Sequence, residues 1–121
     1  MKKIRCAKFG FKSGNTLNTA LLILLLEKPK IGYHLLDELK TFGFDPDKIP
    51  ITIVYRALRG MELSGLTVSR WELSETTPSK RVYYITNNGI EHLKEWQDLA
   101  KKKLEVLNNL VKNIEGKLKK T

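Results

Sequence analysis

The strongest constraint on the fold lies near the end of the chain, where residues 88–120 carry an apolar side chain every three or four positions. This period matches one face of an α-helix, and neither Pro nor Gly interrupts it before Gly116. At 1.5 Å per residue, such a helix reaches about 50 Å. A short domain cannot cover so long a stripe, so its outer half needs a partner, most simply a second copy of the chain. The residues that we expect in this dimer contact are Leu93, Trp96, Leu104, Leu107, Val111 and Ile114.

Three shorter helices are predicted before it. The first begins at Asn15 and is stopped by Pro29, and because apolar residues occupy nearly every face, we expect it to be buried almost all round. The second spans about 31–41. The third begins at Pro50, a favourable first helical residue, and ends before Gly65.

Beyond the third helix, the apolar spacing changes to the alternation that is typical of β-strands. Two short strands, within 66–73 and 82–85, flank a polar tip, and Trp71 is expected to cap this sheet against the helices. The element order predicts a mainly α fold with a small β-hairpin, that is, a winged helix-turn-helix followed by a long dimerisation helix. We divide the chain into a basic N-terminal arm (1–14), a winged helix-turn-helix DNA-binding domain (15–86) and a C-terminal dimerisation helix (87–121).

The charge of the chain points to a polyanionic partner. There are 22 Lys and Arg against 13 Asp and Glu, a net charge of +9, which favours nucleic acid or an anionic membrane. The first helix has no polar face with which to lie on a membrane, and the longest apolar run, 19–26, is shorter than the roughly 20 residues that a span needs. We therefore expect a cytoplasmic protein that binds double-stranded DNA and no membrane.

The N-terminal arm is the most basic part of the chain, with five bases and no acid in residues 1–14. We expect it to add affinity for DNA, as minor-groove arms do. The cations of this arm are Lys2, Lys3, Arg5, Lys8 and Lys12.

Residue types that carry chemistry are scarce. A single cysteine, Cys6, excludes an internal disulfide and a cysteine-based zinc site. The two histidines, His34 and His92, are too far apart in sequence to suggest a metal site. No nucleophile–base pair, pair of acids or phosphate loop is visible. We expect neither enzymatic activity nor a metal or cofactor.

A helical wheel of residues 51–64 separates a core face from an outer face. Val54, Leu58 and Met61 gather on the core side with Ile51 and Ala57. The outer face, which we expect to read DNA, carries Thr52, Arg56 and Arg59, with Tyr55 at its border. Arginine can hold a guanine edge with two hydrogen bonds, whereas hydroxyl groups more often hold phosphate. The hairpin tip is expected to contact the DNA backbone through Ser79, Lys80 and Arg81.

Four sequence segments carry a resemblance to a known family: Leu22-Ile-Leu-Leu-Leu-Glu-Lys-Pro29 followed by Gly32-Tyr33; Val54-Tyr55-Arg-Ala57-Leu58-Arg-Gly-Met61-Glu62-Leu-Ser-Gly65-Leu66; Trp71-Glu72; and Lys80-Arg81-Val-Tyr83-Tyr84-Ile-Thr86-Asn-Asn-Gly89. In this order and spacing, they resemble the PadR family of winged-helix transcriptional regulators over about residues 17–96. A single helix after the wing is similar to the short-chain branch of that family.

The resemblance implies a homodimer that is held by the C-terminal helix and binds a palindromic operator, usually as a repressor. Some members release DNA when an aromatic molecule binds at the dimer interface. The segment Ile51-Thr-Ile-Val54 replaces the Gly-Thr-Leu turn that usually opens the recognition helix, so no operator preference can be carried over.

Trp96 lies on the apolar stripe of the last helix and has two alternative roles. Two such tryptophans across a dimer axis could hold a small aromatic effector, as in the drug-binding relatives. A tryptophan on such a stripe is more often part of the core.

The alternative function is a winged-helix protein–protein interaction module without sequence-specific DNA binding. Such a module should carry an apolar patch where Thr52, Arg56 and Arg59 stand.

Overall fold

The computed structural model describes residues 13–121, and the arm cations Lys2, Lys3, Arg5, Lys8 and Lys12 lie outside these described residues. It confirms the mainly α fold with a small sheet, because helices and a hairpin follow one another in the expected order. The helices are α2 (Ser13–Glu27), α3 (Gly32–Glu38), α4 (Ile51–Leu63) and α5 (Asn87–Lys119), with short 3-10 turns at Leu39–Phe42 and Pro46–Lys48. The strands are β1 (Lys30–Ile31), β2 (Thr67–Glu72) and β3 (Lys80–Ile85).

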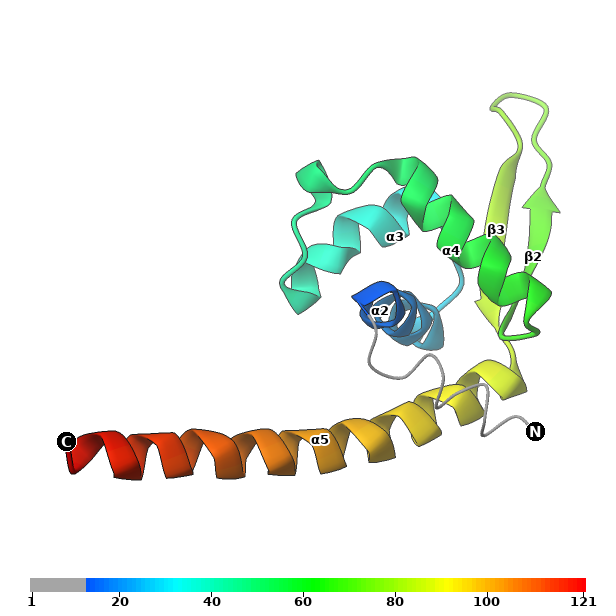
Figure 1. The fold of residues 1–121 in the computed structure, drawn as a ribbon. Helices are drawn as coiled ribbons and strands as arrows, with labels where there is room; N and C mark the ends of the chain where they lie inside the picture. Colours follow the sequence, from blue (N-terminus) through cyan, green and yellow to red (C-terminus); the bar gives the residue numbers. More distant parts are fainter. Residues whose placement is uncertain (1–12) are drawn as a thin grey trace.

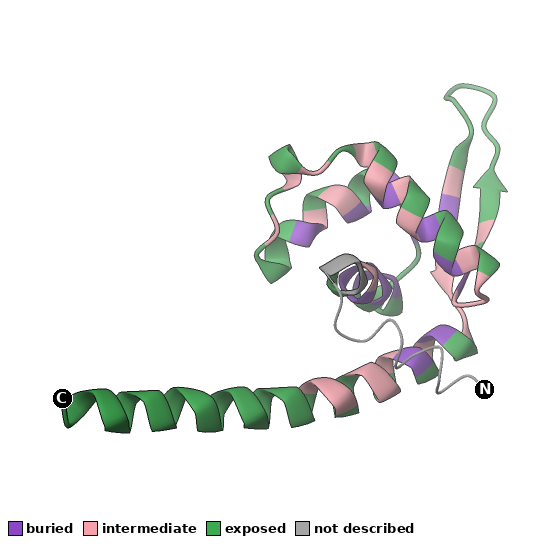
Figure 2. Ribbon diagram, viewed as in Figure 1, coloured by how far each residue is buried: buried purple, intermediate pink, exposed green. Residues whose placement is uncertain are grey.

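The core forms where α2 is enclosed by α3, α4 and the sheet (Figures 1 and 2). Its fully buried side chains are Leu21 and Leu22 of α2, Leu35 and Leu39, Val54 and Leu58 of α4, and Tyr83 of β3. Burying each of these apolar side chains contributes about 1.5–3 kcal/mol. The packing fixes α4 against the rest of the domain, so its opposite face is presented to solvent at a defined angle.

The expectation that α2 is buried nearly all round is wrong on one side. Ile23 is 36% exposed and Leu26 is 52% exposed. Both line an open groove between α2 and the first turns of α5, together with Leu93, Trp96 and Leu104. Only the beginning of α5 passes over α2, so the single chain leaves this side of the helix uncovered (Figure 1).

A third strand, absent from the sequence prediction, precedes α3. Lys30 and Ile31 pair in antiparallel register with Tyr83 and Val82, so β1 completes a sheet in the order β1-β3-β2. The Lys30 side chain is buried, and its Nζ donates to the Leu24 carbonyl at 3.1 Å, to Glu27 at 3.0 Å and to Glu38 at 2.7 Å. These bonds join the end of α2 to the end of α3. Within the described residues, no helix is long and apolar enough to cross a membrane.

Helix α4 ends at Leu63, shortly before Gly65, as the sequence predicts. Gly65 adopts φ 81°, a left-handed conformation that glycine reaches without strain. The Leu66 amide donates back to the Met61 carbonyl at 2.9 Å, which closes the last turn. The chain therefore reverses directly from α4 into β2 and places the hairpin beside α4.

Helix α5 begins at a capped N-terminus and then leaves the domain. Thr86 Oγ1 accepts a hydrogen bond from the Gly89 amide at 3.0 Å and donates one to the Gly65 carbonyl at 2.7 Å. Residues 101–121 are exposed throughout (Figure 2). The outer apolar side chains expected in the dimer contact, Leu104, Leu107, Val111 and Ile114, are each about half exposed.

Candidate nucleic-acid interface

The outer face of α4 matches the helical wheel. Thr52, Arg56 and Arg59 are exposed and Tyr55 is half-buried, while Val54, Leu58 and Met61 are buried against α2 and the sheet. The spacing of the apolar residues thus orients the two arginines away from the core. The structure leaves no apolar patch at these three exposed positions.

The hairpin of β2 and β3, which we call the wing, stands beside α4 and extends beyond it (Figure 1). Its tip is exposed from Leu73 to Lys80, which includes Ser79 and Lys80. Six of the seven residues predicted to bind DNA line one cleft between α4 and the wing, which we call the wing cleft: Thr52, Tyr55, Arg59, Ser79, Lys80 and Arg81. Arg56 is the exception, because it lines a smaller hollow beside His92.

The wing cleft has a volume of about 580 Å³ and gains an aromatic lining that the prediction missed. Tyr33 from the start of α3, Trp71 from β2 and Tyr83 from β3 join Tyr55 there. Trp71 is 60% exposed, so the expectation that it caps the sheet against the helices is wrong. It lies on the cleft face of the wing, beyond the reach of the core. Burial raises the pKa of Tyr83, although the nearby Arg81 acts in the opposite direction.

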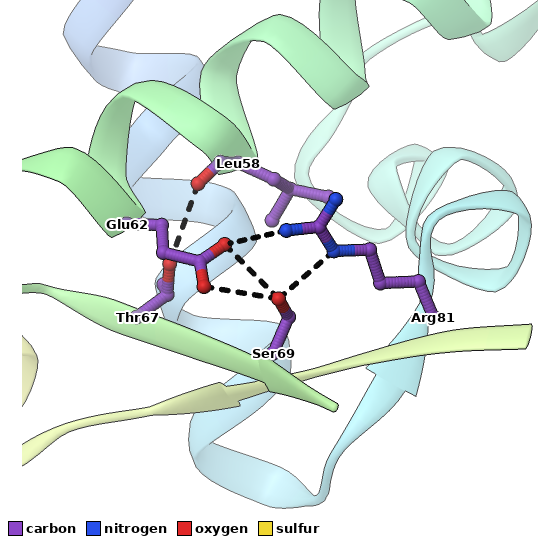
Figure 3. Close-up of polar contacts among 5 residues, drawn as sticks. All are labelled: Leu58, Glu62, Thr67, Ser69 and Arg81. Atoms are coloured by element: carbon purple, nitrogen blue, oxygen red, sulfur yellow. Dashed lines mark hydrogen bonds and ion pairs between the residues drawn. The ribbon is translucent and has the colours of Figure 1, made fainter. Parts of the chain in front are cut away.

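Arg81 is held by a polar network on the side of α4 (Figure 3). Its Nε donates to Ser69 Oγ at 2.9 Å, and its Nη2 lies 3.4 Å from Glu62 Oε1. Ser69 Oγ in turn donates to the same carboxylate, at 3.0 Å and 3.1 Å from its two oxygens. The guanidinium also lies over the rings of Trp71 and Tyr83, at 5.8 Å and 5.7 Å from their centroids.

This network fixes the angle between the wing and α4. Glu62 is on the last turn of α4, Ser69 is on β2 and Arg81 is on β3, so a single cluster ties three elements together. Thr67 Oγ1 adds a bond to the Leu58 carbonyl at 3.3 Å (Figure 3). Sequence reasoning missed Glu62 and Ser69, because residues 19 and 12 positions away from Arg81 share no local pattern with it.

Trp96 lies in the groove between α2 and α5, which we call the α2–α5 groove and which has a volume of about 550 Å³. Trp96 and Leu93 are half-buried there, and Thr19 contributes a buried hydroxyl. Among the residues that the structure describes, no group of three or more His, Cys, Asp or Glu side chains is placed to hold a metal ion.

Comparisons with known proteins agree with this architecture. Residues 21–95 match the family described as "Transcriptional regulator PadR-like family", and no curated protein sequence matches the chain. Protein TM0937, of unknown function and described as a potential transcriptional factor, is 30% identical; the match covers 87% of this chain and 96% of that one, with a TM-score of 0.65. A transcriptional regulator from Clostridium thermocellum is 26% identical over 78% of this chain and 89% of its own, with a TM-score of 0.67.

Bacillus subtilis PadR has been solved in complex with operator DNA. It is 24% identical to this chain, with a TM-score of 0.59, and the match covers 67% of this chain and 46% of that protein. The family match begins within α2, includes α4 and the wing, and ends in the first turns of α5, which is more than half of the sequence. The chain therefore belongs to the PadR-like family of transcriptional regulators.

Proposed function

We propose that this protein is a homodimeric transcriptional regulator that binds a palindromic operator sequence-specifically, as a repressor. Two copies of α4 would enter successive major grooves, and each wing would contact the adjacent backbone. The family membership supports regulation of transcription, and the complex of Bacillus subtilis PadR with operator DNA supports duplex DNA as the partner.

One observation carries the DNA-binding part of this proposal. The exposed face of α4 carries Thr52, Arg56 and Arg59, and of these Thr52 and Arg59 share the wing cleft with Lys80. These side chains come from two elements that are locked together by the Glu62–Ser69–Arg81 network. A rigid pair of cationic elements is what groove and phosphate contacts require.

The test is binding to a labelled duplex from the gene's own upstream region, beside a scrambled duplex, at about 50 and 200 mM salt. We expect a preference of roughly 10³-fold or more for the upstream region. If 6–10 phosphates are contacted, affinity should fall by about 10³–10⁵-fold between the two salt concentrations. No binding at the lower salt concentration would instead favour the protein–protein interaction module.

Two matched variants distinguish the effect of a specific contact in the DNA groove from the effect of losing a positive charge. Arg59→Ala should weaken binding to the preferred duplex by about 1–3 kcal/mol and reduce discrimination if the side chain contacts a base. Lys112→Ala removes the same charge from the exposed outer part of α5, about 100° around the helix from Val111. We expect Lys112→Ala to bind like the wild type, and equal losses in both variants would contradict a specific role for α4.

The homodimer is supported by the apolar stripe of α5. Leu107, Val111 and Ile114 are each about half exposed on one side of a helix that leaves the domain. In analytical ultracentrifugation, we expect twice the chain mass of 13.9 kDa. Val111→Glu should shift the protein to the monomer, whereas Asn109→Glu, on the opposite side of the helix, should not. A wild-type monomer at the concentrations used for DNA binding would refute the dimer.

The α2–α5 groove is the proposed site of an aromatic effector. Trp96 and Leu93 offer an apolar surface there, and the buried Thr19 hydroxyl has no hydrogen-bond partner among the described residues. A planar cationic dye should quench the fluorescence of Trp96 in a Trp71→Phe background. No quenching at sub-millimolar dye would remove this site.

We also expect the basic arm to increase DNA affinity. Deleting residues 1–12 removes all five of its cations. The deletion should lower affinity for both duplexes and reduce the salt slope by about 0.9 for each lost phosphate contact. An unchanged affinity and slope would leave the arm without a role in DNA binding.

A further inference from the structure

The wing cleft carries exposed aromatic rings that a DNA duplex leaves without a stacking partner. Tyr33 is 65% exposed and Trp71 is 60% exposed, and they line the cleft from two separate elements. Bases inside a duplex are stacked on one another, so a protein ring reaches a base face only if the base leaves the helix. At about 580 Å³, the cleft has the size of a small-molecule site.

The charged lining of the wing cleft is entirely cationic. Arg59, Lys80 and Arg81 line it, and no Asp or Glu does so among the described residues. Arg81 is compensated by Glu62 and held over the rings of Trp71 and Tyr83. Neither Arg59 nor Lys80 forms an ion pair with any residue that the structure describes. Two cations without an ion-pair partner among the described residues therefore line an aromatic cleft, although Glu72 lies opposite Lys80 in the β2–β3 ladder.

We propose that the wing cleft is a binding site for a purine nucleotide. The base stacks on the rings of Tyr33 and Trp71, and the phosphate lies between Arg59 and Lys80. A phosphate monoester carries close to two negative charges at neutral pH and so matches these two cations better than a carboxylate does. The hydroxyls of Thr52 and Ser79 line the same cleft and can donate to the phosphate or the ribose.

The nucleotide and the operator compete for the same side chains. Thr52, Arg59 and Lys80 belong both to the wing cleft and to the proposed DNA-binding face. Nucleotide binding therefore blocks DNA directly, a step that rests on the proposed function. A ligand in the α2–α5 groove acts from the other side of α2 and leaves these side chains free.

Calorimetric titration of the full chain with adenosine 5′-monophosphate tests the site. We expect a Kd below about 1 mM. Adenosine, which lacks the phosphate, should bind about 10–150-fold more weakly, and ribose 5-phosphate, which lacks the base, about 5–150-fold more weakly. Equal affinity for the nucleotide and ribose 5-phosphate would overturn the proposal, because it would show a phosphate site without a base site.

Variants locate the binding. Trp71→Ala and Lys80→Ala should each weaken nucleotide binding by at least about fivefold, whereas Trp96→Ala and Lys112→Ala should leave it unchanged. Trp71 and Lys80 are exposed, and circular dichroism verifies that the variants fold. Two results would overturn the assignment to the wing cleft. One is no binding at a nucleotide concentration of about 10 mM, tenfold above the expected upper limit of Kd; the other is binding that is lost only in Trp96→Ala.

Competition with DNA separates this proposal from the proposed function. Saturating nucleotide should raise the Kd for the preferred duplex at least about tenfold in the wild type and much less in Trp71→Ala. Nucleotide binding with the expected variants but without any DNA binding would support the site and refute the regulator. Normal DNA binding without nucleotide binding would refute the site alone.

Discussion

Gly89, at the start of α5, should not tolerate even a methyl group. A β-carbon there would overlap the carbonyl oxygen of Leu66 and lie 2.6 Å from Ile85 Cγ1. The first obstacle is backbone, which cannot rotate away as a side chain can. Overpacking of this kind costs about 1–3 kcal/mol.

Relief of the overlap has its own cost. If α5 moves away from the turn between α4 and β2, the Thr86 amide loses its 3.0 Å bond to the Leu66 carbonyl, and Thr86 Oγ1 loses its 2.7 Å bond to the Gly65 carbonyl. Each bond contributes about 1 kcal/mol, and the better helix propensity of alanine offsets about 1 kcal/mol of the total. Because the overlap and its relief are alternative costs, Gly89→Ala should lower the free energy of unfolding by about 1–2 kcal/mol.

Gly116 provides the matched control in the same helix. No atom lies within 4 Å of a β-carbon added there, and the residue faces away from Val111 and Ile114. Gly116→Ala should raise stability by about 0.5–1 kcal/mol. Urea unfolding of both variants and the wild type, at one protein concentration, measures the difference. Equal stability of Gly89→Ala and the wild type would refute the close approach of α5 to Leu66.

Three further predictions concern polar groups. Burial alone would lower the pKa of Lys30, but its hydrogen bonds to Glu38 and Glu27 outweigh this effect and raise the pKa. Lys30→Met should therefore lower the free energy of unfolding in urea by about 1–3 kcal/mol. An unchanged stability would contradict this role of Lys30. Glu62→Gln should weaken operator binding, measured by fluorescence anisotropy, because it releases Arg81, although the loss of a negative charge alone would strengthen binding. The substitution should lower the free energy of unfolding by less than about 1 kcal/mol, since the side chains of Glu62 and Arg81 are 29% and 37% exposed. Burial lowers the pKa of His92, while Glu95 acts in the opposite direction, so the unfolded chain binds this proton at higher pH than the folded chain. Stability should therefore fall as the pH drops below the ordinary value of 6.5, and His92→Asn should flatten this part of the unfolding profile.

The sequence predicted those helices and strands in which the spacing of apolar residues indicates which side is buried. Helix α4 has one apolar and one polar side, so the exposure of Arg56 and Arg59 followed from spacing alone. Gly65 and Pro29 marked helix ends, because their backbones restrict what can follow. Both signals are local, and neither needs knowledge of the tertiary contacts.

The structure differs from the sequence prediction where contacts between distant parts of the chain determine the outcome. Strand β1 has two residues, too few to show an alternation. The Glu62–Arg81 pair joins residues 19 positions apart, and only the reversal at Gly65 brings them together. Trp71 is a large apolar residue in a strand, yet it faces the wing cleft, because the hairpin extends past the core that would have covered it.

The exposed side of α2 and the exposed stripe of α5 have a common explanation in the proposed dimer. Ile23 and Leu26 share the α2–α5 groove with Leu104, where the first exposed part of α5 begins. The apolar groove continues into the apolar stripe of α5, and this combined surface fits the α5 stripe of a second copy of the chain. In such a dimer, the direction of α5 sets the distance between the two copies of α4. This direction is fixed where Thr86 and Gly89 hold the start of α5 against the α4–β2 turn at Gly65 and Leu66. A change at Gly89 should therefore alter which spacing of operator half-sites the dimer prefers, even though this residue lies outside both the proposed dimer stripe and the proposed DNA-binding face.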